Sequence, residues 1–159
     1  MLSRHKEHIR NASPYVYIGL GLLVIFLIIS TSRIQRVGDG GEYYALYYAW
    51  DTTSRPWMSE PAYQAYDELY NSNKINAMLP RAWLESSFPD LRIGSTSDFN
   101  HFWFYSFLAF LCAKILSFIG ITLQAHESFL VLHYFLLAAL TSLSFRYFRW
   151  RGVLTIALM

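Results

Sequence analysis

Three long apolar runs, separated by one polar segment, set the strongest limit on what this chain can fold into. The first run, Tyr15–Ser32, has a centre at Leu20–Ile29 that contains only Leu, Val, Ile, Phe and one Gly. The other two runs are Phe102–Ile121 and Ser128–Phe145. A helix rises about 1.5 Å per residue and the hydrocarbon core of a bilayer is about 30 Å thick, so runs of this length are typical of transmembrane helices.

The charged residues are few, and the acidic ones are gathered in one segment. Only 15% of the residues are charged, whereas soluble domains average about 25%. All but Glu7 and Glu127 of the 11 acidic residues lie between Asp39 and Asp98. This layout predicts membrane spans around one large water-facing segment. A net charge of +2 with no basic stripe indicates no nucleic-acid partner, and the single cysteine, Cys112, excludes an internal disulfide.

Two basic clusters constrain the topology. The positive-inside rule places residues 1–14 in the cytoplasm and residues 33–100 outside, and it also favours the cytoplasm for Arg146–Arg151. An even number of crossings must separate the two clusters, so one of the three apolar runs is predicted not to cross. Phe102–Ile121 is the expected one, because it carries Lys114 and begins with aromatic residues that are typical of the membrane interface.

The predicted fold class is therefore an all-α membrane protein, with transmembrane helices and a large extracytoplasmic loop that contains short amphipathic or interfacial helices. In chain order, we expect a cytoplasmic basic tail at 1–14, a transmembrane helix at 15–32, the extracytoplasmic loop at 33–100, an interfacial or re-entrant apolar helix at 101–121, a transmembrane helix at 128–145, a basic cytoplasmic loop at 146–152 and the start of a further span at 153–159. Since Gly152–Met159 covers only about 12 Å, the chain is expected to be the N-terminal part of a longer protein.

Several alternatives to this organisation stay open. The first run could be a cleaved signal peptide, because its N-terminal flank is basic and small residues follow it. All three runs could cross the membrane, with the charge rule overridden. The chain could also be a genuinely short protein that ends in an apolar tail.

Aromatic residues recur at helical spacing within the loop. Glu42–Trp50 and Pro61–Tyr70 are each predicted to form a short amphipathic helix. In the second helix, Tyr63, Tyr66 and Tyr70 are predicted to share one side. Aromatic residues this dense beside a membrane are typical of interfacial helices.

The best candidate for a catalytic motif is Gly38-Asp39-Gly40-Gly41-Glu42-Tyr43-Tyr44, a few residues beyond the first run. An acid at this depth lies near the lipid headgroups and any lipid-linked phosphate, and the glycines let the backbone turn and leave room for a ligand. On the local pattern alone a structural role is favoured, with Asp39 as an N-cap and Glu42 at the third helical position of a capping box, and the two roles are not exclusive. No cofactor is predicted. Two acids alone are a weak signal for a divalent metal ion, which stays open.

The order of these features resembles the GT-C superfamily of integral membrane glycosyltransferases, and above all its protein O-mannosyltransferase and aminoarabinose-transferase branch, family 39. The likeness consists of the basic tail, one span, the motif at 38–44, Asn100-His101-Phe102-Trp103-Phe104-Tyr105 opening an apolar helix, and a span that ends in Arg-Tyr-Phe-Arg-Trp-Arg-Gly. Its specific motifs cover only about residues 38–50 and 98–108.

The resemblance implies an enzyme in a bacterial plasma membrane, an inverting glycosyltransferase of the cell envelope. It would take a sugar from a polyprenyl-phosphate donor and pass it to a glycan, lipid or protein acceptor outside the cytoplasm. Asp39 matches the family's acid in the first outer loop, whose implied role is to orient or deprotonate the acceptor hydroxyl. Glu42 falls near the family's second acidic position. The alternative is a non-catalytic polytopic membrane protein, such as a transporter fragment or an envelope assembly subunit.

The resemblance also implies residues that bind substrate. His101 stands where the family places a His or Lys that faces the donor phosphate. This sequence departs from the family there, because Phe102 and Trp103 follow His101 in place of prolines, which weakens that assignment. Tyr105, one turn after His101, and Tyr43 in the first motif are the other expected substrate-binding residues.

Overall fold

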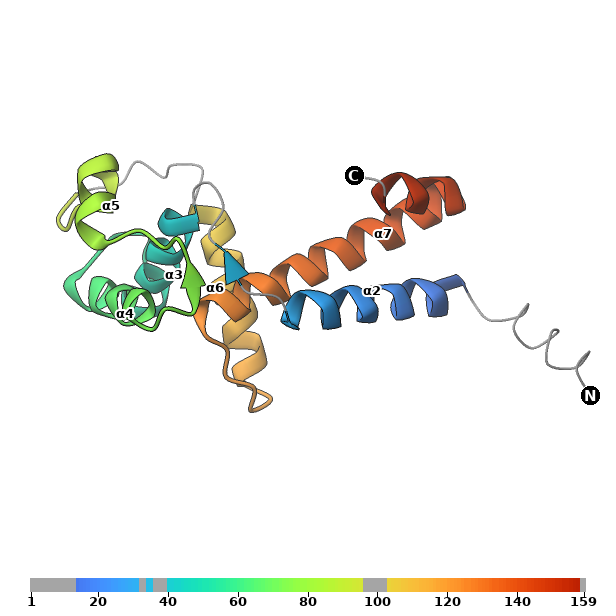
Figure 1. Ribbon diagram of the computed structural model, residues 1–159, viewed down its shortest axis with the longest axis horizontal. Helices are drawn as coiled ribbons and strands as arrows, with labels where there is room; N and C mark the ends of the chain where they lie inside the picture. Colours follow the sequence, from blue (N-terminus) through green and yellow to red (C-terminus); the bar gives the residue numbers. More distant parts are fainter. Residues whose placement is uncertain (1–13, 32–33, 36–39, 96–102, 158–159) are drawn as a thin grey trace, which may run out of the picture. The chain divides into compact units, whose positions relative to one another are not determined.

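The computed structural model describes residues 14–31, 34–35, 40–95 and 103–157 (Figure 1). These residues are mostly helical, which confirms the all-α expectation. The elements are α2 (Pro14–Thr31), β1 (Ile34–Gln35), α3 (Gly40–Thr53), α4 (Glu60–Asn71), β2 (Ile75–Asn76), α5 (Arg81–Ser87), the 3-10 helix η1 (Pro89–Leu91), α6 (Trp103–Ser117) and α7 (Ala125–Ala157). The chain divides into two compact units, one made of residues 1–32 and 133–159 and the other of residues 33–132.

The first unit contains a pair of antiparallel helices, α2 and the later part of α7 (Figure 1). Tyr15 stacks edge-on against Phe145 with ring centroids 5.4 Å apart, and Phe26 does the same against Tyr134 at 4.8 Å. The contacting residue numbers run in opposite directions along the two helices, which defines the antiparallel pairing. Among the described residues, Ala125–Arg151 of α7 is the one helix whose length and composition would allow it to cross a membrane.

The predicted basic loop at 146–152 lies in α7, at the point where two helices meet across a kink. Helical geometry is broken at Arg149, whose φ of 55° and ψ of −148° lie outside the helical region. The break falls inside the predicted loop, so helical structure is interrupted in that segment without being replaced by a longer loop. The helix resumes after Arg149, and the predicted further span at 153–159 is described as helical up to Ala157.

The second unit is built around α3, which packs against both α4 and α6. The sequence predicts an amphipathic interfacial helix here, but α3 is covered on most sides, and Ala45 and Ala49 are fully buried. The helix α6 presents a matching row of small buried residues, Ser106, Ala109 and Ala113. Small side chains on both helices allow their backbones to approach closely. The aromatic periodicity predicts one buried side for α3 and does not reveal this second contact.

The helix α6 lies within the segment 101–121 that is predicted to be interfacial or re-entrant. Its 15 residues extend about 22 Å, less than the roughly 30 Å of a hydrocarbon core. Trp50 of α3 holds the start of α6, because its indole Nε1 donates a hydrogen bond to the carbonyl oxygen of Trp103 at 3.3 Å. Near the end of α6, Lys114 forms an ion pair with Asp51 of α3 at 2.9 Å.

The helix α4 contributes the largest side chains of this core. Tyr63 and Tyr66 are fully buried, as the predicted aromatic side requires, but Tyr70 is 36% exposed. Tyr70 lies in the last turn of α4, where Leu69 enters the core instead. Leu69 follows Ala62 by seven residues, or about two helical turns, so the two side chains lie on the same buried face of α4.

The two buried tyrosines of α4 also fix the irregular segment that follows it. The hydroxyl of Tyr63 donates to the carbonyl oxygen of Leu91 at 2.8 Å, and the hydroxyl of Tyr66 donates to that of Leu79 at 2.7 Å. Arg81 adds a third link, because its guanidinium bonds both carboxylate oxygens of Glu60, at 2.7 and 3.0 Å, and lies 4.4 Å above the Tyr63 ring. Hydrogen bonding to Arg81 lowers the pKa of Glu60.

These hydroxyl contacts lead to a stability prediction. Tyr63→Phe and Tyr66→Phe keep each ring but remove the donor to a carbonyl oxygen, so each should lower the free energy of unfolding by about 1 kcal/mol. Tyr70→Phe is the matched control and should change the free energy of unfolding by no more than a few tenths of a kcal/mol. Denaturant unfolding of the full chain in detergent, followed by tryptophan fluorescence, measures the difference. Equal losses for all three variants would contradict the assigned contacts.

Candidate functional site

The helix α3 carries the described part of the first sequence motif at its N-terminal end. Asp39 lies outside the described residues, and α3 begins with Gly40. Glu42 lies in the first turn of α3 and is only 2% exposed. A carboxylate in the first turn is stabilised by the partial positive charge of the helix N-terminus, which is compatible with the capping role open to Glu42.

Gly41 has a packing role that the sequence did not reveal. A Cβ at this position would lie 3.2 Å from Leu84 Cδ2, 3.5 Å from the Tyr66 hydroxyl and 3.6 Å from Leu79 Cδ1. The first turn of α3 therefore packs directly against side chains from α4, from α5 and from the segment that leads into α5. The expectation that this glycine leaves room for a ligand is wrong, because protein atoms already fill that space.

The two motifs that carry the family resemblance meet at Tyr43 and Tyr105. Their rings pack edge to face with centroids 5.0 Å apart, although 62 residues separate them in sequence. The hydroxyl of Ser106 donates to the backbone carbonyl oxygen of Tyr43 at 3.0 Å, which fixes the starts of α3 and α6 against each other. Phe129 of α7 packs on Tyr105 at 5.2 Å and completes an aromatic cluster.

Burial determines the protonation state of Tyr105. Desolvation raises the pKa of its hydroxyl to about 12, with smaller contributions from Tyr43 and Tyr44. The Tyr105 hydroxyl therefore stays protonated at physiological pH, as that of an ordinary tyrosine does, and the shift extends this state to higher pH. His101, which precedes Tyr105 by one helical turn in the sequence, lies outside the described residues.

A metal centre has no support within the described chain. Among residues 14–31, 34–35, 40–95 and 103–157, the structure brings together no three His, Cys, Asp or Glu side chains that could hold an ion. Asp39 is not among these residues. A divalent ion shared by Asp39 and Glu42 therefore stays a sequence-based possibility.

Comparisons with known proteins give no family for this chain. No family model matches it, and neither a curated protein nor a solved structure matches it significantly. The likeness to membrane glycosyltransferases therefore depends on the two short motifs and the order of the predicted spans.

Proposed function

We propose that this chain belongs to an integral membrane glycosyltransferase of the GT-C type, which transfers a sugar from a polyprenyl-phosphate donor to an extracytoplasmic acceptor. The observation that carries the proposal is the contact between Tyr43 and Tyr105. It joins the two segments that resemble the family's donor and acceptor motifs. Residues from segments so far apart in sequence are expected to meet if both contribute to one site.

The helices of the first unit support the membrane part of the proposal. Ala125–Arg151, which enters the first unit at residue 133, has 27 residues and exceeds the roughly 30 Å of a bilayer core. The helix α2 is shorter, at 18 residues or about 27 Å, and comes close to that thickness. Both helices expose rows of large aliphatic side chains, which water disfavours and lipid accepts. These exposed residues include Leu20, Leu23, Leu27, Leu136, Leu140 and Leu143. With the N-terminus in the cytoplasm, the 33–100 segment would face the outer side.

The proposed reaction is a direct displacement. An acceptor hydroxyl attacks the anomeric carbon, a new C–O bond forms, and the bond to the phosphate breaks with inversion of configuration. In this scheme Asp39 accepts the hydroxyl proton, and the leaving polyprenyl phosphate keeps the electron pair. A donor from His101 would offset the negative charge that grows on the phosphate. Tyr105 of α6, one turn after His101 in the sequence, is a further substrate-binding residue of this scheme.

A second candidate function has one specific observation in its favour. Gly41 is packed against protein atoms and Glu42 is almost fully buried, so these two residues of the motif fit a structural role. A motif that serves only to start and pack α3 would suit a non-catalytic membrane protein. The two functions differ in whether sugar transfer occurs at all.

The deciding experiment is a transfer assay with the full chain reconstituted in lipid vesicles. Radiolabelled polyprenyl-phosphate sugars serve as donors, nucleotide sugars as control donors, and an envelope extract as acceptor. The proposal expects label to enter the acceptor from a lipid-linked donor and not from a nucleotide sugar. Folded protein that transfers from neither type of donor would favour the non-catalytic alternative.

A further inference from the structure

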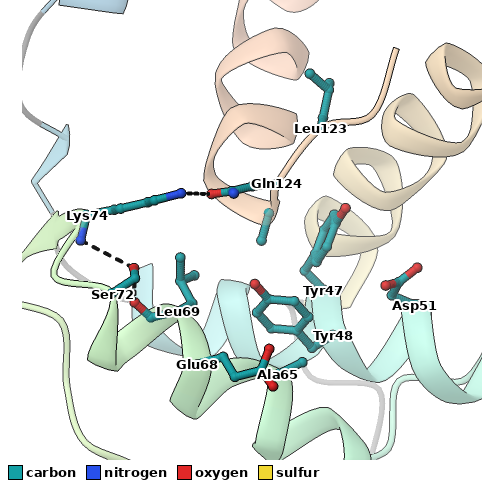
Figure 2. Close-up of a pocket in the computed structure, with 11 residues that line it drawn as sticks. Tyr47, Tyr48, Asp51, Ala65, Glu68, Leu69, Ser72, Lys74, Leu123 and Gln124 are labelled. Atoms are coloured by element: carbon teal, nitrogen blue, oxygen red, sulfur yellow. Dashed lines mark hydrogen bonds between the residues drawn. The ribbon is translucent and has the colours of Figure 1, made fainter. Parts of the chain in front are cut away.

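A pocket of about 320 Å³ lies beside the C-terminal half of α3 (Figure 2). It is lined by α3, by α4 and the turn after it, and by the segment that leads into α7. The polar side chains around it are Tyr47, Tyr48, Asp51, Glu68, Ser72, Lys74 and Gln124. Sequence reasoning singled out none of these for binding, because they come from three separated segments.

The pocket is separate from the motif at the start of α3. Asp51 is nine residues beyond Glu42, which corresponds to roughly 13 Å along the helix axis. A ligand here would contact the opposite end of α3 from Glu42.

The formal charges of the pocket sum to zero only when the ion-paired neighbour of Asp51 is included. Asp51 forms an ion pair at 2.9 Å with Lys114, which is not part of the lining, and the lining residues Glu68 and Lys74 carry opposite charges. An ionic ligand would therefore meet no net charge of opposite sign here, and single exposed charge pairs contribute little to binding. A neutral ligand that hydrogen-bonds to these groups does not depend on such a charge.

The pocket offers both donors and acceptors of hydrogen bonds. Lys74 Nζ donates to Gln124 Oε1 at 2.8 Å, which orients the amide and leaves its NH₂ group and two ammonium hydrogens as donors. Figure 2 shows Tyr48 and Glu68 on the other side of the pocket from this pair. Burial raises the pKa of Tyr48, with further contributions from Tyr47 and Asp51, so its hydroxyl stays protonated.

We propose that this pocket binds a neutral polyhydroxylated ligand the size of one sugar ring. Each hydroxyl of such a ligand both donates and accepts, which matches the mixture of carboxylate, amide, ammonium and phenol groups. Leu69, Leu123 and the tyrosine rings supply apolar surface for the C–H faces of a ring. The volume lies at the lower end of the range for small-molecule sites. The inference goes beyond the proposed transfer reaction, because binding here requires no lipid-linked donor.

Saturation-transfer NMR with the full chain is the appropriate test, because a ligand of this size is expected to bind only in the millimolar range. The probes are methyl glucoside and methyl mannoside, with glucosamine and glucuronate as a cationic and an anionic control of similar size. The protein is held in a detergent without a sugar headgroup, since such a headgroup would compete. We expect saturation transfer to the two neutral glycosides and little to either charged sugar.

Variants connect the signal to the pocket. Leu123→Trp places a large ring in the cavity and should abolish the signal. Glu68→Gln removes a charged acceptor at an exposed position and should weaken binding about 10-fold. Asp67→Asn, next to Glu68 on α4 but outside the pocket, is the matched control and should bind as the parent does.

Three results would overturn the inference: no transfer to either neutral glycoside, transfer mainly to a charged sugar, or a signal that survives both pocket variants. The far-ultraviolet circular dichroism of each variant checks that it has folded. The glycosyl-transfer assay is independent, so a failure of sugar binding and a failure of the proposed enzyme activity can be told apart.

Discussion

Asp39→Asn is expected to lower sugar transfer by about 10²-fold or more while leaving expression and folding unchanged. The reason is that asparagine keeps the shape of the side chain but cannot accept the proton of an acceptor hydroxyl. Asparagine is also about as good an N-cap as aspartate, so a purely structural Asp39 predicts little change in stability or transfer. The two roles of Asp39 therefore give opposite forecasts for the same variant.

The measurement compares initial rates of transfer from a polyprenyl-phosphate sugar, at equal amounts of folded protein. Asp67→Asn is the matched control, because it makes the same chemical change on α4. Burial raises the pKa of Asp67, Arg81 opposes that shift, and Glu60 and Glu85 add to it, so the carboxylate has both favourable and unfavourable neighbours. Its replacement by the isosteric Asn should leave transfer intact. Full transfer by the Asp39 variant would remove Asp39 from the mechanism, and Glu42 would be the next residue to replace.

The sequence was informative where one local pattern determines the outcome. The apolar run at 15–32 predicted the helix α2, and the run at 101–121 predicted α6. The tyrosine spacing in Pro61–Tyr70 predicted α4 and its two buried rings. These features depend on helix propensity and on the separation of apolar from polar residues, both of which are properties of neighbouring residues.

The features that depend on contacts between distant segments could not be predicted. Aromatic spacing suggested one apolar side for α3, but α4 and α6 both pack against it. The motif alone suggests that its glycines leave room for a ligand, because nothing in it indicates that Leu84, 43 residues after Gly41, packs against that glycine. The same limit applies to the ion pair between Asp51 and Lys114. The resemblance to a family indicates that the segments around Tyr43 and Tyr105 contribute to function, but it does not predict that the two rings are in contact.

Leu84→Ala should lower the free energy of unfolding by about 2–5 kcal/mol, which makes it the most destabilising of the substitutions considered. Leu84 is fully buried and belongs to the same core as Tyr63 and Tyr66. Its Cδ2 atom would lie only 3.2 Å from a Cβ at Gly41, so it packs directly on the first turn of α3. Truncation would leave a cavity between α5 and the first turn of α3, at Gly41.

The neighbouring residue provides the control for this prediction. Trp83 lies on the same helix and is 43% exposed, so Trp83→Ala removes a larger side chain but should cost far less. Denaturant unfolding of the full chain, followed by circular dichroism so that the loss of Trp83 does not alter the probe, gives both values. If residues 33–132 did not form a packed unit, both substitutions would change the free energy of unfolding by similar, small amounts. A loss below about 1 kcal/mol for Leu84→Ala would therefore contradict a packed unit around α3, and would weaken any proposal that places a defined site on it.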